Sequence, residues 1–265
     1  MATSADQIRI KIERAREHLR ELQSEVKAYL DTNPYVIGYR RNPQTRRLFY
    51  HLLSVHDVPG RISAIAGDVL QNLRSALDHL AYALFNVGPG GTADCSATDI
   101  CFPIFDDATK YERGSPRRVR GMKQDAIDAI NSTKPYKDGN DTLWLLHTLN
   151  IIDKHRYLIL VGSALQGVDV GAVVSHDFKA AFPQFDSMPI LHTFFPPADR
   201  KFPLEVDDEL YVDAQDAEVN NDMKYEFDVA IDEPGITEGE PLIKTLQDMV
   251  DLVDKLVTDF ARLLT

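Results

Sequence analysis

The segment Gly67 to Phe85, GDVLQNLRSALDHLAYALF, places an apolar stripe and many reactive side chains on one predicted helix. At 100° per residue its apolar residues share an arc of about 100–120°, which is typical of a helix packed on a core. These are Val69, Leu73, Ala76, Leu77, Leu80, Ala83 and Leu84. A neighbouring face carries Asp68, Asn72, Ser75 and His79, while Arg74 and Asp78 form an i,i+4 pair on a third face. Such side chains prefer specific partners to bulk solvent, so we expect this helix to be in contact on more than one side.

Three further helices accompany it. Residues 5–31 carry a heptad-like apolar seam, which predicts packing within the chain or, alternatively, a contact between the two copies of a homodimer. Residues 142–156 follow Asp141, a good N-cap, and are apolar almost all round, so this helix should be largely buried. Its polar residues His147, Asn150, Asp153 and Lys154 then need partners. The last helix, 242–264, follows Thr237 and Glu240 at the spacing of a capping box.

Strand patterns complete the fold prediction. The β-branched and aromatic runs 35–41 and 48–55 flank an Asn-Pro turn and predict a hairpin. Short runs at 157–161, 168–174, 190–195, 210–212 and 225–231 predict a small, mostly antiparallel sheet. We therefore expect an α+β fold. Residues 1–156 plus 237–265 would form a helical bundle with a β-hairpin at 35–55, and residues 157–236 would form a small β-rich insertion.

The charge is uneven along the chain. The net charge is −12, yet residues 199–265 alone contain 19 acidic and 6 basic residues. The first 198 residues therefore carry 22 acidic and 23 basic residues and remain free to bind a polyanion. Residues 110–123, KYERGSPRRVRGMK, form a basic segment that we expect to be a loop. Its Arg117, Arg118 and Arg120 predict an RNA contact or, alternatively, a solvated surface.

Several classes of protein are disfavoured. No run of 18 apolar residues exists, so the sequence predicts no membrane span, and the N-terminus lacks the apolar core of a signal peptide. We expect a cytoplasmic protein. Cys95 and Cys101 share one predicted loop without a neighbouring His, which favours free thiols over a zinc site. The sequence also lacks a phosphate-binding glycine loop and the GxSxG and HExxH motifs, so we expect neither a cofactor nor a metal.

The remaining motif is Arg74-Ser-Ala-Leu-Asp78-His79, an Arg and a His separated by four residues within a helix. It resembles the Arg-x4–6-His motif of the HEPN superfamily, helical domains that include many metal-independent ribonucleases of toxin and phage-defence systems. The segments NLRSALDHL and IDKHR are also similar to segments of a group of uncharacterised bacterial proteins. The resemblance covers one motif and its helical setting.

The resemblance implies a metal-independent endoribonuclease with Arg74 and His79 as catalytic residues and an antitoxin or other protein as partner. An Arg guanidinium can hold the scissile phosphate, and a His can move a proton to or from the RNA oxygens. In that family, paired motifs from two subunits usually form one composite site. Arg74 and His79 lie about 140° apart around an ideal helix, so both reach one target only across a homodimer. The family often has Asn, Asp or His where Ser75 stands here.

The other residues of this candidate site have supporting roles. Asp68, Asn72 and Asp78 share the helix with the motif, and Asp78 can pair with Arg74. His155 and Arg156 either favour the helix C-terminus electrostatically or line the same cleft as Arg74. The alternative interpretation is a non-catalytic bundle that binds a partner protein or a small ligand. The Arg/His helix would then serve a buried polar network or a dimer interface.

Overall fold

The computed structural model describes residues 4–89, 100–155, 158–197 and 201–264. It has an α+β fold in which all paired strands run antiparallel. The chain forms two compact units. Unit 1 contains Met1–Gln23, Gly60–Ile159 and Ile243–Thr265, and unit 2 contains Ser24–Pro59 and Leu160–Leu242.

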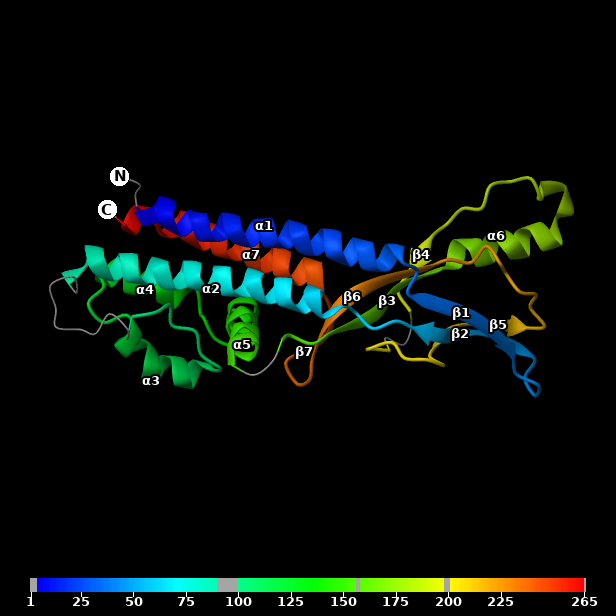
Figure 1. Cartoon of the computed structure of the whole chain (residues 1–265), viewed down its shortest axis with the longest axis horizontal. Helices are drawn as coiled ribbons and strands as arrows, with labels where there is room; N and C mark the ends of the chain where they lie inside the picture. Colours follow the sequence, from blue (N-terminus) through cyan, green and yellow to red (C-terminus); the bar gives the residue numbers. More distant parts are fainter. Residues whose placement is uncertain (1–3, 90–99, 156–157, 198–200, 265) are drawn as a thin grey trace. The chain divides into compact units, whose positions relative to one another are not determined.

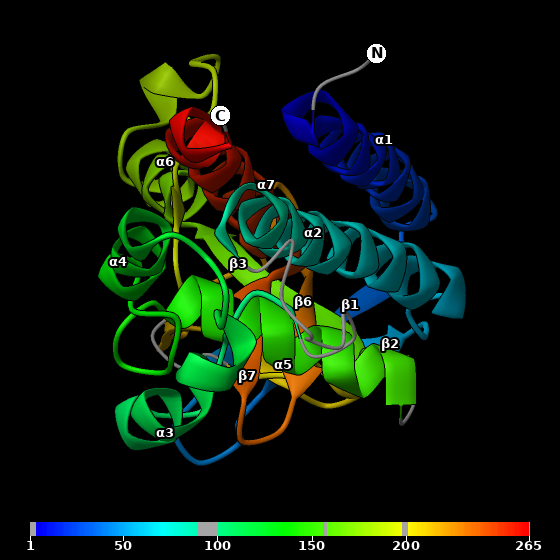
Figure 2. The ribbon, with the colours of Figure 1, turned by 90° about the vertical axis from the view of Figure 1, so that its left-hand side faces the viewer.

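Unit 1 is helical. Its longest helices are α1, whose first part belongs to this unit, α2 and α7, which lie side by side in Figures 1 and 2. α5 packs against α2, and two short helices complete the unit (Figure 2). The bounds are α1 Ser4–Asp31, α2 Gly60–Val87, α3 Ala108–Arg118, α4 Gln124–Ser132, α5 Asp141–His155, α7 Leu242–Phe260 and the 3-10 turn η4 Ala261–Leu263.

The apolar seam of α1 is buried within the chain. Its residues Ile8, Ile12, Ala15, Leu19, Leu22, Val26 and Tyr29 are all at most 6% exposed. The seam therefore serves intramolecular packing, and a second copy cannot use it without opening the chain. An ion pair between Arg16 and Asp254, 2.9 Å apart, joins α1 to α7 at the surface.

Unit 2 holds two sheets. The first has the order β1-β2-β5, with β1 Tyr35–Arg41, β2 Arg47–Val55 and β5 Glu209–Gln215. The second has the order β4-β3-β6-β7, with β3 Val161–Asp169, β4 Phe194–Phe195, β6 Tyr225–Glu233 and β7 Thr237–Pro241. Helix α6 (Val170–Ala181) and the 3-10 turn η3 (Pro183–Phe185) follow β3. The predicted hairpin is confirmed as β1 and β2, but it pairs with β5 in unit 2 rather than joining the helices of unit 1.

Five local predictions differ from the structure. Of the predicted strands 157–161 and 190–195, only Val161 and Phe194–Phe195 lie in a strand, and Tyr157 is outside the described residues. The basic segment predicted as a loop is helical from Ala108 to Arg118, because Asp107 caps the helix by accepting from Lys110 N at 2.7 Å. The predicted strand 168–174 is instead the end of β3 followed by α6. There the fully buried Asp169 is the N-cap and accepts from Ala172 N at 3.1 Å. Thr237 and Glu240 lie in β7 and form no capping box. At α3 and α6 a side-chain cap overrides the local pattern, and Thr237 and Glu240 pair with β6 instead.

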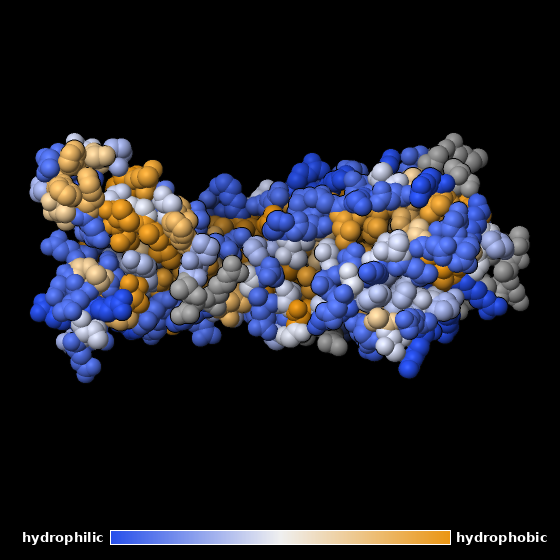
Figure 3. Space-filling view, turned by 180° about the vertical axis from the view of Figure 1, so that it is seen from behind, coloured by the Kyte–Doolittle hydropathy of each residue, from blue (hydrophilic) through white to orange (hydrophobic). Residues whose placement is uncertain are grey.

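A large apolar surface follows β3. The segment from α6 to β4 exposes Val174, Phe178, Phe182, Phe185, Met188, Leu191 and Phe195. Phe178 contacts both Phe182 and Phe185, with ring centroids 5.0 and 5.6 Å apart. Figure 3 shows this apolar surface on unit 2. In the described part of the chain no helix is long and apolar enough to cross a bilayer.

Candidate functional site

Arg74 is the best-enclosed charged residue of the predicted motif. It lies on the buried face of α2 and is 8% exposed, because the neighbouring turns carry the apolar stripe that packs into unit 1. Its Nη2 donates to Asp78 Oδ1 and to the carbonyl oxygen of Phe102, both at 2.8 Å. Asp78 Oδ1 in turn accepts from Phe102 N at 3.0 Å. Arg74 and Asp78 thus hold the backbone of Phe102 from both sides.

The other terminal nitrogen of the Arg74 guanidinium, Nη1, makes no such hydrogen bonds with any described residue. Arg74 Nη1 is buried and has no hydrogen-bond partner among the described residues. Arg74 lines a cavity of about 270 Å³ together with Cys101, Phe102, Arg118 and His147. His147 Nδ1 is also buried without a partner in the described structure. A buried charged donor and a buried ring nitrogen without partners are costly unless something fills the cavity.

Two cations, Arg74 and Arg118, and one carboxylate, Asp106, line this cavity. Burial and the positive charges of Arg74 and Arg118 together lower the pKa of His147 to about 4, with Asp106 opposing them. Burial also raises the pKa of the Cys101 thiol, against the opposing effect of Arg118 and Arg74. His147 is therefore neutral at pH 7, while Arg74 and Arg118 remain charged. The cavity suits an anion that accepts hydrogen bonds.

His79 lies elsewhere on α2. It is exposed and lines a separate cavity of about 370 Å³ together with Gln7, Asp78, Tyr82 and Asn86. Asp78 borders this cavity and also binds Arg74, but Arg74 and His79 do not line a common cavity in one chain. The two residues of the motif therefore present different faces, as their spacing on the helix requires.

The supporting residues are spread over unit 1. Exposed Asp68 lies close enough to Asp153 of α5 that its charge raises the pKa of that carboxyl, in addition to the larger effect of burial. Asn72 Nδ2 donates to the backbone oxygen of Asp68 at 2.8 Å, so its side chain serves its own helix. His155 is exposed at the end of α5, and Arg156 lies outside the described residues.

Of the three predicted RNA-binding arginines, the structure brings one to the cavity. Arg118, the last residue of α3, lines it beside Arg74 and His147. Arg117 and Arg120 are exposed, on and just beyond the end of α3. The cavity and the basic segment are thus neighbours through Arg118.

Sequence reasoning did not identify His147 as a site residue. The available signal was a histidine on a helix that is apolar almost all round, which indicates that the ring needs a partner. The identity of that partner depends on how α5 packs against α2, and no local pattern states it. Phe102 contributes through its backbone, which leaves no trace in residue type.

The sequence also predicts a buried polar network that joins α2 to α5. The structure places Asp153 of α5 directly against the backbone of Gly67, where any side chain would collide with it. Asn150 Oδ1 is buried and has no partner among the described residues. The described side chains also contain no group of three His, Cys, Asp or Glu residues that could hold a metal ion.

No family model, curated protein or solved structure matches this chain.

Proposed function

We propose that the protein is a metal-independent endoribonuclease that holds the scissile phosphate in the cavity of Arg74 and His147. The observation that carries the proposal is Arg74 Nη1, a buried charged donor without a hydrogen-bond partner in the described structure, on a residue that lines a cavity together with His147, whose Nδ1 is unpartnered as well. A phosphate oxygen would accept from Nη1 while Nη2 stays bound to Asp78 and Phe102. Charge-assisted bonds of this kind are the strongest that a phosphate receives from a protein.

The reaction needs a proton transfer as well as an anchor. The 2′-oxygen of RNA attacks phosphorus, the bond from phosphorus to the 5′-oxygen breaks, and a proton moves from the 2′-hydroxyl to the leaving oxygen through an acid–base group. In the proposal His79 is this group and Arg74 stabilises the charge that develops on phosphate. Because the two residues line different cavities of one chain, His79 of a second copy must reach the phosphate that Arg74 holds.

The first test is cleavage of total RNA by the full chain in the presence of EDTA. Arg74→Ala and His79→Ala should each abolish cleavage while the protein stays folded. His155→Ala is the matched control, because it removes an exposed histidine of the same unit that the proposal does not use. Retained cleavage in either variant contradicts the assigned role of that residue.

Mixing the two inactive variants tests the composite site. A mixed dimer of Arg74→Ala and His79→Ala contains one site with both native residues, so cleavage should return to a fraction of the native rate. Loss of cleavage in His147→Ala with full cleavage in His79→Ala would instead place proton transfer at His147 within one chain. Failure of the mixture to recover activity would contradict the two-copy arrangement.

A second candidate function rests on a different observation. Arg74, Asp78 and both backbone groups of Phe102 form a closed set of hydrogen bonds that fixes the residues around Phe102 to α2. Such a network stabilises a bundle without catalysis, and the protein would then bind a partner or a small ligand. On this alternative the native chain cleaves no RNA, and Arg74→Ala lowers the melting temperature.

A further inference from the structure

Several strand edges of unit 2 have no neighbouring strand in the described structure, among them those of β1 and of the first part of β6. β1 pairs with β2 on one side only. β6 pairs with β3 from Tyr225 onwards, but β7 covers its other edge only from Ala230 to Glu233. The β6–β7 pairing begins at Ala230 opposite Pro241, and proline has no N–H to donate to a ladder. Residues 225–228 of β6 are therefore free to pair along one edge.

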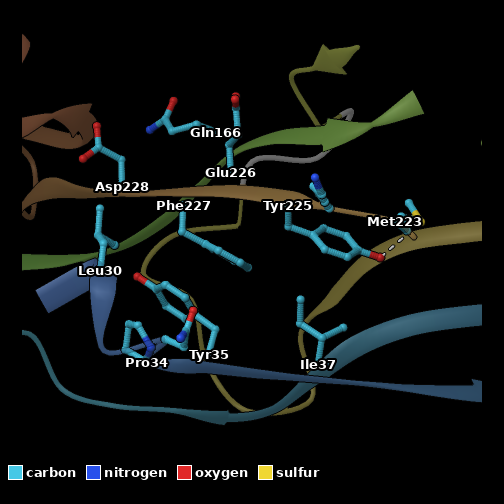
Figure 4. A pocket seen from close by; sticks show the side chains of 12 residues that line it. Leu30, Pro34, Tyr35, Ile37, Gln166, Met223, Tyr225, Glu226, Phe227 and Asp228 are labelled. Atoms are coloured by element: carbon cyan, nitrogen blue, oxygen red, sulfur yellow. Dashed lines mark hydrogen bonds between the residues drawn. The ribbon is translucent and has the colours of Figure 1, made fainter. Parts of the chain in front are cut away.

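Tyr35 and Ile37 of β1 and residues 225–228 of β6 line one open cavity of about 720 Å³, which we call the edge groove. Figure 4 shows Tyr225 and Phe227 of β6 directed towards Tyr35 and Ile37 of β1. Tyr35 and Phe227 are stacked, with ring centroids 3.9 Å apart, and Tyr225 lies 6.3 Å from Phe227. All four side chains are only partly buried at the margin of the unit 2 core. The inner side of the groove is thus aromatic and apolar.

The opposite face of the same strand carries two carboxylates, and Lys224, directly before the strand, also lines the groove. Glu226 and Asp228 alternate with Tyr225 and Phe227, and Figure 4 shows their carboxylates directed away from the aromatic side. Neither carboxylate forms an ion pair with a described residue, and Asp228 accepts only from the backbone N of Val229, at 2.8 Å. Burial raises the pKa of Asp228, and the hydrogen bond from Val229 N opposes this effect.

The net charge of unit 2 favours a basic partner at long range as well. Its two segments, residues 24–59 and 160–242, contain 21 acidic and 9 basic residues, a net charge of −12. The remaining 20 acidic and 20 basic residues belong to unit 1, so unit 2 accounts for the whole net charge of the protein. A polyanion is repelled here, whereas a basic partner is attracted and approaches faster.

We propose that the edge groove binds an extended basic segment of a partner protein, which adds as a strand to β6 along residues 225–228. Side chains of an added strand alternate between the two faces, as those of β6 do. Every second residue of the partner would therefore lie beside Tyr225 and Phe227, and the residues between them beside Glu226 and Asp228. The chemistry recognises alternating apolar and basic residues, with backbone hydrogen bonds providing affinity and the side chains providing specificity.

The test uses the full chain and a capped, fluorescent seven-residue peptide that alternates Lys and Val. We expect saturable binding, with shifts of the backbone amide signals of residues 224–228. The same peptide with N-methyl groups on alternate backbone nitrogens should not bind, because methylation removes the donors that pair with an edge. A peptide that alternates Glu and Val should not bind either.

Paired variants separate the groove from general attraction between opposite charges. Glu226→Gln combined with Asp228→Asn should weaken binding about tenfold, whereas Glu218→Gln, which removes an exposed charge elsewhere in unit 2, should change it less than about twofold. No binding of the Lys/Val peptide, binding that survives N-methylation, or equal losses in the two sets of variants would overturn the proposal. A finding that the groove is occupied by a second copy of this chain would also overturn it. The assay involves no RNA, so its outcome is independent of the proposed ribonuclease.

Discussion

Arg74 Nη2 lies 2.8 Å from Asp78 Oδ1, one turn further along α2, and the same nitrogen donates to the Phe102 carbonyl. The Arg74 side chain is 10% exposed and that of Asp78 is 37% exposed, so the pair is enclosed on the arginine side only. Its two members also differ in what they can do for a ligand. Asp78 Oδ1 accepts from Arg74 and from Phe102 N, whereas Arg74 Nη1 is buried without a hydrogen-bond partner among the described residues.

Asp78→Ala should destabilise the protein by about 1–2 kcal/mol. The substitution removes the acceptor of both Arg74 Nη2 and Phe102 N and leaves a buried guanidinium with one fewer partner. Urea unfolding at pH 7 measures the change. Asp248→Ala is the control, since Asp248 pairs with Lys244 on the exposed side of α7 and such pairs contribute at most about 0.5 kcal/mol. Equal losses in the two variants would show that the Phe102 contacts do not stabilise the fold.

His147 should make stability depend on pH between about 4 and 6.5. Burial lowers its pKa in the folded state to about 4, so between these values the unfolded chain binds a proton that the folded chain does not. The free energy of unfolding therefore falls as the pH drops from about 6.5 to 4, by up to about 3 kcal/mol from this residue. In His147→Gln that part of the pH dependence should disappear. A histidine NMR titration with an ordinary pKa for this ring would contradict the prediction.

Inorganic phosphate should partly reverse the lowering of the His147 pKa. An anion in the cavity offsets the charges of Arg74 and Arg118 and favours the protonated ring, so the pKa of His147 should rise when inorganic phosphate is added. The same NMR titration, repeated with and without phosphate, measures the change. Arg74→Ala should abolish the response to phosphate. An unchanged His147 pKa at saturating phosphate would show that the anion does not bind beside this ring.

Gly67→Ala should destabilise the protein by about 1–3 kcal/mol, although alanine is the better helix former. An added Cβ would collide with the Asp153 carboxylate, so α5 or the Asp153 side chain would have to move. Gly60→Ala is the matched control at the start of the same helix, because a Cβ added there would meet nothing within 4 Å. Thermal unfolding of both variants distinguishes them. A neutral Gly67→Ala would mean that Asp153 moves aside at no cost.

Much of the fold could be predicted from periodic patterns. The stripe from Val69 to Leu84 is buried throughout, and the β-branched and aromatic runs around the Asn-Pro turn correctly predict a hairpin, because both patterns extend over several residues. The errors occur where one side chain determines the local structure. Asp169 starts α6 inside a valine-rich run that otherwise favours a strand.

The candidate site was less predictable than the fold. The i,i+4 spacing correctly predicts the contact of Arg74 with Asp78, since both residues lie on one helix. Phe102 and His147 come from distant parts of the chain, and their approach to Arg74 depends on tertiary packing. A strand edge without a partner, as in the edge groove, is likewise a property of sheet order and carries no sequence signal of its own.

Asp169 should be among the residues of unit 2 most sensitive to substitution. It is fully buried, accepts from Ala172 N at 3.1 Å and from Thr193 N at 3.0 Å, and contacts His192 Nδ1. Burial opposes ionisation, but the hydrogen bonds from His192, Thr193 and Ala172 outweigh it and lower the pKa of Asp169. A lowered pKa stabilises the fold above the ordinary carboxyl pKa, and this contribution is lost as the pH falls through the lowered value. Asp169→Ala should cost about 3 kcal/mol at pH 7 and less at pH 2.

The control for Asp169→Ala is Asp177→Asn on the exposed side of α6, which should change stability by less than about 0.5 kcal/mol. Urea unfolding at the two pH values, followed by circular dichroism, measures both variants. If Asp169→Ala loses as much stability at pH 2 as at pH 7, the loss comes from packing. If Asp169→Ala loses no stability at pH 7, the N-cap hydrogen bond is not needed for α6 to begin at Val170. The predicted result, a loss that shrinks with acidification, requires that the ionised carboxylate itself holds α6 and Thr193 together.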